Sequence, residues 1–595
     1  MAAKARNEIS PEFQWDLTHI YKTREAWLDA YKEASGLVDE IEKHAGHLGE
    51  SADALLSALN AVSSAEMKTE RVYIYALLNV SGDNGDPKNQ EMEAIAANLF
   101  VKLSTACAFL EPEILSIPKE TLEKYMEDPR LATYRHRLDN IERGRSHTLN
   151  KEQEKILAMV GDISGNPQNT FTMLESVDMK FPDVIDEEGK SAPLTHGTYG
   201  VYRESRDPKL RKDCFEKYYG VFKDHINTLA SMYTGSVKFD TFFAQTRHFE
   251  SACEAALFGS NVPVEVYDKL IETIHEGLPI LHRYVEIRKK AMKVSELNFY
   301  DMSAPIVDNV EIDMPYEDAK VLVKKALAPL GEDYQKLLDR AYSENWIDVY
   351  ENKGKTTGAF SCGMYGVHPY VLLNYTNKLD DAFTLAHELG HSMHSCYSSE
   401  AQDYENHDYH ILVAEVASTV NEVLLTKYLL KTEKDPHRRA YILNHFLEGF
   451  RATVFVQALF AEFEYKAHAL YQESGSVTSQ ALNDIFLNLN EEYYKGTVMN
   501  ENVEIGWSRI PHFYNAFYVY QYATGFCSAV AIADSIYKTG SAENYLKFLK
   551  TGGSDYPIEE LKIAGVDLTK PDTVKNALKV FDESLTEFEE LLSSL

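Results

Sequence analysis

The chain has 595 residues, 44% hydrophobic and 26% charged, proportions that exclude wholesale disorder, collagen and a bundle of membrane helices. Its 92 acidic side chains outnumber 60 basic ones, and the formal net charge of -32 disfavours nucleic acid and anionic membranes as partners. Only 30 glycines and 19 prolines are present, both below average usage, so we expect a mostly α-helical protein.

The first third of the chain has the pattern of helical hairpins. Apolar residues recur every three or four positions over 24–44, 51–80 and 89–110, which is typical of amphipathic helices. The turn-rich stretch SGDNGDP at 81–87 and Pro112 interrupt this pattern. Farther along, DEEGK at 186–190 separates two short apolar segments and predicts a small β-hairpin.

Two Asp-Pro pairs predict the starts of later helices, because Asp is a capping residue and Pro suits the first helical position. They are Asp207-Pro208 and Asp435-Pro436. Between them, glycines punctuate residues 354–375, and an apolar run closes this stretch, which predicts a small β-sheet. We expect an N-terminal helical domain over 1–205, with the hairpin near its end, and a second domain over 206–595.

The segment 380–397 contains His387, Glu388 and His391 in the HExxH arrangement. Positions i and i+4 share one helix face, so the two imidazoles can bind a single metal ion, and zinc prefers such nitrogen ligands. Glu388 follows the first ligand and can take a proton from a metal-bound water. The motif predicts hydrolase chemistry, and the alternative is an exposed helix with two incidental histidines.

A catalytic zinc ion usually needs a third protein ligand. The HExxHxxGxxH pattern is excluded, because His394 and Tyr397 occupy the positions of its glycine and third histidine. An apolar helix predicted over 410–425 carries Glu415 among apolar neighbours, where we expect a buried carboxylate that requires a cation. Glu415 is therefore the predicted third ligand, and an ion pair with a lysine or arginine is the alternative.

Other polar residues near the motif have possible roles. Glu422 or Ser418 could support a ligating imidazole from the second coordination sphere. His394, His407 and His410 are rival ligands, ranked below Glu415.

These motifs are similar to those of a known family. HELGHSMH at 387–394, followed by VAEVASTVNE at 413–422, resembles the thimet-oligopeptidase-like family of zinc metallopeptidases, most closely its oligoendopeptidase F branch. The resemblance covers nearly the whole chain and includes PEFQWDLTHIY, NVPVEVYDKLI, KTTGAFSCG and RIPHFYNAFYVYQYATG. It implies an elongated, mostly helical, two-part body around a deep substrate channel, with a small β-sheet beside the HExxH helix.

The resemblance also implies a function. One Zn2+ per chain would be bound by His387, His391 and Glu415, with Glu388 as the general base. The enzyme would hydrolyse internal bonds of short peptides, and residues 206–595 would form the catalytic domain. Oligopeptides are the implied partners.

The late aromatic segment supplies candidates for contacting the carbonyl under attack, namely His512, Tyr514, Tyr518 and Tyr520. Among them we favour His512 and Tyr518. The residue pattern alone is equally typical of core packing. A free edge on the strand predicted over 368–375 would allow an extended peptide to bind through main-chain hydrogen bonds.

Two other functions compete with an endopeptidase. A zinc carboxypeptidase of similar helical build would need a basic group for the free C-terminal carboxylate. A non-catalytic peptide-binding protein would have a degenerate or structural metal site, but Glu388 argues against it because structural zinc sites use four protein ligands and no base. Six cysteines without CxxC spacing, and a start that lacks the apolar run of a secretory signal, predict a cytoplasmic protein. The sequence does not indicate an oligomeric state.

Overall fold

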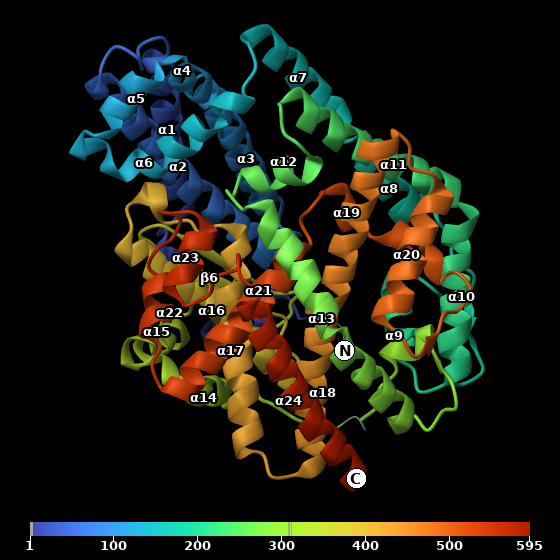
Figure 1. Ribbon diagram of the computed structural model, residues 1–595. Coiled ribbons are helices and arrows are strands. Elements are labelled where there is room, and N and C mark those ends of the chain that lie inside the picture. Colours follow the sequence, from blue (N-terminus) through green and yellow to red (C-terminus); the bar gives the residue numbers. More distant parts are fainter. Residues whose placement is uncertain (1–3, 308–309, 311) are drawn as a thin grey trace. The chain divides into compact units, whose positions relative to one another are not determined.

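The computed structural model describes residues 4–307, 310 and 312–595. The chain forms two compact units: unit 1 comprises Met1–Arg145, Glu311–Leu429 and Ile532–Val566, and unit 2 comprises Ser146–Val310, Leu430–Ala531 and Asp567–Leu595. Both units are mostly helical, as the composition predicts (Figure 1). The sequence division at residue 205, the elongated shape and the deep channel stay predictions.

Unit 1 combines twelve helices with a three-stranded sheet among its described residues. Its helices are α1 (Arg24–Ile41), α2 (Ala52–Gly82), α3 (Pro87–Cys107), α4 (Leu110–Ser116), α5 (Lys119–Met126), α6 (Arg135–Arg143), α14 (Tyr316–Ala326), α15 (Glu332–Ser343), α16 (Leu379–Ala401), α17 (Ile411–Thr432), α22 (Glu543–Phe548) and α23 (Pro557–Ile563). The last residues of α17 belong to unit 2, and α21 (Tyr520–Thr539) runs from unit 2 into unit 1.

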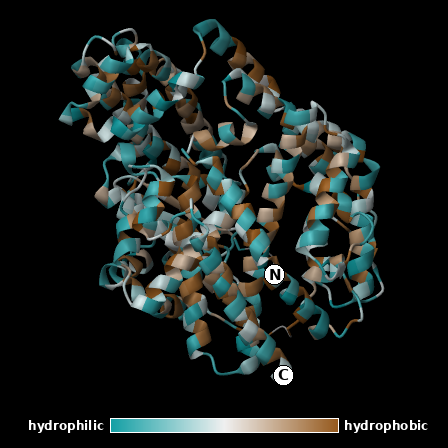
Figure 2. Ribbon diagram, viewed as in Figure 1, coloured by the Kyte–Doolittle hydropathy of each residue, from teal (hydrophilic) through white to brown (hydrophobic). Residues whose placement is uncertain are grey.

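The helical hairpins predicted for the first third are confirmed. The Thr23 and Ser51 side chains cap α1 and α2 by accepting backbone N–H groups, and the Trp27 indole donates to the Val72 carbonyl at 2.9 Å. Figure 2 shows hydrophilic and hydrophobic residues alternating along the helices, as amphipathic packing requires. The stretch Pro87–Ser116 is long and apolar enough to cross a membrane by length and composition, a test that core helices also meet, and α3 packs on α1 and α2.

The sheet predicted within 354–375 is confirmed. It has the strand order β4 (Ile347–Asp348), β6 (Val367–Leu372), β5 (Phe360–Met364), with β6 parallel to β4 and antiparallel to β5. The condition set for peptide binding on the strand over 368–375, a free edge, is not met, because β6 is the central strand. The short strand β4 lies outside the predicted stretch and pairs with one edge of β6, and β5 pairs with the other.

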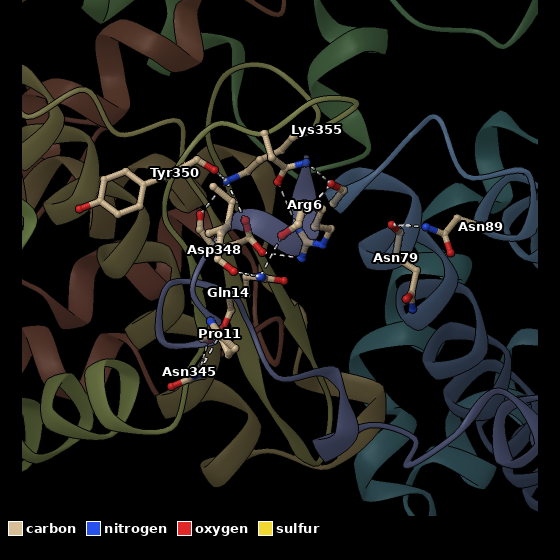
Figure 3. Close-up of polar contacts among 12 residues, drawn as sticks. Arg6, Pro11, Gln14, Asn79, Asn89, Asn345, Asp348, Tyr350 and Lys355 are labelled. Carbon is tan, nitrogen blue, oxygen red and sulfur yellow. Dashed lines mark hydrogen bonds and ion pairs between the residues drawn. The ribbon is translucent and has the colours of Figure 1, made fainter. Parts of the chain in front are cut away.

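A buried ion-pair network joins the start of the chain to this sheet (Figure 3). Asp348 in β4 is 1% exposed and forms ion pairs with Arg6 Nη2 at 2.6 Å and Lys355 Nζ at 2.7 Å. Burial lowers the pKa of Lys355, although the neighbouring carboxylate opposes that shift. Two cations thus compensate one carboxylate removed from water, and Asn345 adds a hydrogen bond to the Pro11 carbonyl at 3.0 Å.

Unit 2 is also helical. Its helices are α7 (Lys151–Ser164), α8 (Asn166–Met173), α9 (His196–Tyr202), α10 (Pro208–Asp224), α11 (Ile226–Thr246), α12 (Ala252–Phe258), α13 (Val264–Ala291), α18 (Pro436–Phe450), α19 (Val456–Ser474), α20 (Ser479–Tyr493) and α24 (Asp572–Ser594). Asp207 and Asp435 cap α10 and α18, which confirms both Asp-Pro predictions.

Short strands and 3-10 turns complete unit 2. The hairpin around 186–190 is confirmed, since β1 (Val184–Ile185) pairs antiparallel with β2 (Ser191–Ala192). A parallel pair joins β3 (Leu297–Asn298) to β7 (Thr497–Val498). The 3-10 segments η8 (Phe299–Ser303), η12 (Val503–Arg509) and η13 (Pro511–Tyr514) carry several residues discussed below.

Candidate active site

Helices α16 and α17 of unit 1 bring the predicted ligands together. His387 and His391 lie one turn apart on α16, as the HExxH spacing predicts, and their Nε2 atoms are 3.2 Å apart. Glu415 lies on α17, with Oε2 at 3.4 Å from His387 Nε2 and 3.6 Å from His391 Nε2. The three residues therefore form a cluster whose ligand atoms all lie within 4.8 Å of one another.

The spacing of this cluster fits one tetrahedral ion. Ligand atoms at the usual zinc distances of about 2.0–2.2 Å stand about 3.3–3.6 Å apart in tetrahedral geometry. The observed separations of 3.2, 3.4 and 3.6 Å match that requirement. Two imidazoles and one carboxylate leave a fourth position open, as a catalytic rather than a structural metal site requires.

The burial predicted for Glu415 is wrong, because its side chain is 43% exposed. Its apolar neighbours Leu412, Val413 and Val416 are buried, whereas Glu415 lies on the helix face that carries its oxygen toward the histidines. The Ser418 hydroxyl donates to Glu415 Oε2 at 3.0 Å. In the described part of the chain, its ion-pair partners are the two histidines and not a lysine or arginine.

Glu422 has the supporting position predicted for it. His387 Nδ1 donates to Glu422 Oε1 at 2.5 Å, which directs Nε2 of the same ring toward the cluster. Burial opposes protonation of His387, but the hydrogen bond and charge of Glu422 raise its pKa to about 9. Burial and the neighbouring His387 charge lower the pKa of His391 to about 4, so its imidazole is neutral at pH 7 and able to bind a metal.

Glu388 points away from bulk water on the same helix and is 6% exposed. Burial raises the pKa of its carboxyl to about 7; the nearby His387 opposes this shift, and the Glu415 and Glu422 carboxylates add to it. A carboxyl that titrates near neutrality is suited to both accepting and releasing a proton.

Gly390 sets the distance between the two helices. A Cβ at this position would lie 2.5 Å from Ser418 Cα and 2.6 Å from the Ala417 carbonyl oxygen, closer than side chains tolerate. The Asn421 side chain then donates across the same interface to the Ala386 carbonyl at 2.9 Å. The roles of Gly390 and Asn421 were not predicted from the sequence, although a glycine inside a predicted helix is a signal of close packing.

The rival histidines lie outside the cluster. His394 is buried and stacks on the Tyr409 ring with centroids 3.7 Å apart. His407 hydrogen-bonds through Nδ1 to the Tyr404 carbonyl at 2.6 Å, and His410 reaches the Asp555 carbonyl at 3.2 Å. Each has a structural partner of its own.

The late aromatic candidates lie in unit 2 and fall into two groups. Tyr520 is 2% exposed and packs on Tyr267 with centroids 5.3 Å apart, and Tyr514 packs on Phe171 at 4.9 Å. Burial raises the pKa of both phenols well above their ordinary value. Tyr520 therefore has the environment of a core residue, whereas Tyr514 is partly exposed and packs against an aromatic core cluster of unit 2.

His512 is exposed, Tyr518 is partly exposed, and their rings lie 6.1 and 5.5 Å from the ring of Tyr522. Phe517, next to Tyr518, has the left-handed φ of 58°. Its N–H donates to the buried Glu464 carboxylate at 2.8 Å, which holds the strained turn before Tyr518. No role was predicted for Glu464 from the sequence. It is a buried acidic residue of α19, where most of the buried residues are apolar.

Comparisons with known proteins identify the family of this chain. The sequence model of Peptidase family M3 matches residues 201–580, and that of Oligopeptidase F matches residues 113–181. The chain belongs to peptidase family M3. As a member, it is a metallo-oligopeptidase, which acts on peptide bonds.

Similar proteins span nearly the full chain. Oligopeptidase PepF of Bacillus subtilis is 42% identical over 99% of this chain and 88% of its own length. An oligoendopeptidase F homolog of Lactococcus lactis is 40% identical over 99% of both chains. The crystal structure of oligoendopeptidase-F from Enterococcus faecium matches this M3 fold with a TM-score of 0.74 and 37% identity, covering 96% of this chain and 99% of that one. A Chlamydophila abortus structure gives a TM-score of 0.93 and 32% identity, covering 99% and 100%.

Proposed function

We propose that this M3 peptidase is a zinc-dependent endopeptidase that hydrolyses internal bonds of short peptides. The observation that carries the proposal is the set of three separations, 3.2, 3.4 and 3.6 Å, between the nitrogen and oxygen atoms of His387, His391 and Glu415. One Zn2+ per chain fits this donor set, since zinc prefers imidazole and carboxylate ligands in tetrahedral geometry. The names of the oligoendopeptidase relatives support an action on oligopeptides.

The residues around the cluster have separate roles in this proposal. Zinc would supply Lewis acidity, lowering the pKa of a bound water and polarising the peptide carbonyl. Glu388, one residue after the first ligand and largely buried, takes the proton from the attacking water and passes it to the leaving nitrogen. Glu422 keeps the His387 ring oriented by accepting a hydrogen bond from its Nδ1–H group.

His512 and Tyr518 are the proposed donors to the negative charge that develops on the carbonyl oxygen. Accessibility supports them over Tyr520, whose phenol is buried in unit 2, and Tyr514, although partly exposed like Tyr518, packs its ring on Phe171. A cytoplasmic location belongs to the same proposal and is supported by six cysteines that are all free thiols, as a reducing compartment maintains them.

The test is peptide cleavage followed by mass spectrometry, with metal analysis of the same sample. We expect one zinc per chain, loss of cleavage on chelation, and recovery on adding zinc back. Glu388→Gln should lower kcat by about 10²- to 10⁴-fold, with zinc content unchanged, because it removes the base but no ligand. Glu400→Gln, an exposed change on the same helix, is the matched control.

A C-terminally amidated peptide separates the endopeptidase from the carboxypeptidase. Internal cleavage of the amidated peptide at the rate of the free acid supports the proposal. Full activity without a divalent metal, or release of single C-terminal residues only, would show it to be incorrect.

A further inference from the structure

Unit 2 contains a cavity of about 140 Å³ that is lined by aromatic residues and arginines. Its lining residues belong to α9, α10, α19, α20, η8 and η12 and to their flanking residues, all within unit 2. Its walls are largely aromatic and include Tyr199, Phe215, Tyr219 and Phe299. A cavity of this size is comparable with the ~150 Å³ that accommodates a benzene ring in an engineered protein.

Four arginines line the cavity, and two of them already have carboxylate partners. Arg211 binds Asp301 through Nε and Nη2 at 3.0 and 2.7 Å, and Arg451 binds Glu448 at 2.8 Å. Asp301 balances the charge of Arg211, whereas Glu448 is shared by Arg451 and the buried Arg288, at 2.8 Å from each. The surroundings of the cavity therefore carry excess positive charge even before the remaining two arginines are considered.

Arg203 and Arg509 have no carboxylate partner among the residues that the structure describes. The Nε of Arg509 donates to the Tyr219 hydroxyl at 2.8 Å, a neutral acceptor. Arg203 directly follows α9 and lines the same cavity. No acidic side chain contributes to the cavity wall. Both residues are partly exposed, so two guanidinium groups line a small, mostly apolar space without a carboxylate to balance their charge, an arrangement that a bound anion would stabilise.

We propose that this cavity binds a small organic carboxylate that carries one apolar, ring-sized group. Guanidinium groups bind carboxylates through paired, charge-assisted hydrogen bonds, and the aromatic wall would cover the apolar part of such a ligand. An inorganic anion would leave that wall in contact with water. A nucleotide requires more room, since pockets for ligands of that size have about 300–1,000 Å³.

Two sources share this chemistry, a free carboxylic acid and the C-terminal residue of a peptide. The inference does not depend on zinc or on the role of Glu388. It concerns residues of unit 2 alone, so that its failure leaves the proposed function untouched.

The test is calorimetric titration of the zinc-loaded full chain with 3-phenylpropionate. The isosteric 3-phenylpropionamide and inorganic phosphate serve as probes of charge and of the apolar wall, and N-acetylphenylalanine represents a peptide end. We expect saturable binding of the acid, with the amide and phosphate bound at least tenfold more weakly. Equal binding of N-acetylphenylalanine would assign the site to peptide ends, and its exclusion would assign the site to free acids.

Variants locate the ligand. Arg509→Gln and Arg203→Gln should each weaken binding by about 10- to 100-fold, the effect of losing one charge-assisted hydrogen bond. Val456→Phe should block the acid by filling the cavity, and it provides an answer if Arg509→Gln does not fold. Arg438→Gln, on α18 with a side chain 48% exposed, is the matched control and should bind as wild type does.

Three outcomes would overturn the inference. They are no saturable binding of the acid at millimolar concentration, equal affinity for acid and amide, and unchanged affinity in both arginine variants. His387→Ala distinguishes the cavity from the candidate metal site. If this variant loses the acid while the arginine variants keep it, the acid binds at the metal cluster instead.

Discussion

Replacing Gly390 with alanine should separate α16 from α17 and disable the metal cluster. The added Cβ would stand 2.5 Å from Ser418 Cα, whereas ordinary contact begins near 3.4 Å, so the helices must shift by about 0.9 Å. The same shift carries Glu415 away from α16, where its Oε2 now lies 3.4 Å from His387 Nε2. The separation would reach about 4.3 Å, beyond the roughly 4.2 Å that two ligands can span on one zinc ion even when directly opposite.

Zinc binding must then draw the helices together against the clash. Overpacking of this kind costs about 1–3 kcal/mol, so we expect zinc affinity to fall by about 10- to 100-fold. Competition with a chromophoric chelator measures this affinity, and denaturant unfolding measures stability on the same protein.

Gly36→Ala is the matched control, because nothing lies within 4 Å of the added Cβ in α1. It should leave zinc affinity unchanged and stabilise the protein by about 0.5–1 kcal/mol, the helix preference of alanine over glycine. Wild-type zinc affinity in Gly390→Ala would refute the argument that this contact sets the ligand spacing.

The remaining predictions address the ligands, the proton donors and a buried acid. Glu415→Ala should lose zinc more severely than Glu422→Ala, which we expect to cost about 10- to 100-fold in affinity; equal losses by chelator competition would contradict the ligand assignment. Tyr518→Phe should lower kcat by about 10²- to 10³-fold with little change in KM, whereas the packed Tyr520→Phe should leave kcat unchanged in the same steady-state assay. Burial raises the pKa of Glu560 from 4.5 to about 8, so the folded state keeps a proton there that the unfolded state has lost, and stability falls as pH rises between these values. Glu560→Gln should flatten that fall, with a gain on the order of a few kcal/mol near pH 8 that vanishes near pH 5, as measured by urea unfolding.

The parts of the fold that depend on local sequence were predictable. The capping residues Asp207 and Asp435, the 3.6-residue periodicity and the HExxH spacing each involve residues close together in the sequence, and the structure confirms the helices they predict. The position of β4 was not predictable, because a two-residue strand carries no pattern and gains its place only from pairing with β6.

Features that join distant segments were harder to foresee. The exposure of Glu415 depends on which side of α17 faces α16, and Gly390, a variable position of the HExxH motif, and Asn421 decide that through contacts between the two helices. The buried carboxylate of Glu464 acts on Phe517, 53 residues away. No local sequence pattern predicts a contact between such distant residues. Sequence periodicity therefore identified the helices but not which of their faces pack together.

The interleaving of the two units constrains how the protein is made. Unit 1 needs Ile532–Val566, so its last segment leaves the ribosome only after about 30–110 s at the usual 5–20 residues per second. The core of helices α1 to α6 consists of residues between Trp27 and Leu138, so it can form early, whereas Asp348 is synthesised long after its partner Arg6. The ion pairs that join the start of the chain to the sheet therefore form late in synthesis. Because segments of the two units alternate along the chain, no single cut in the gene separates one complete unit from the other.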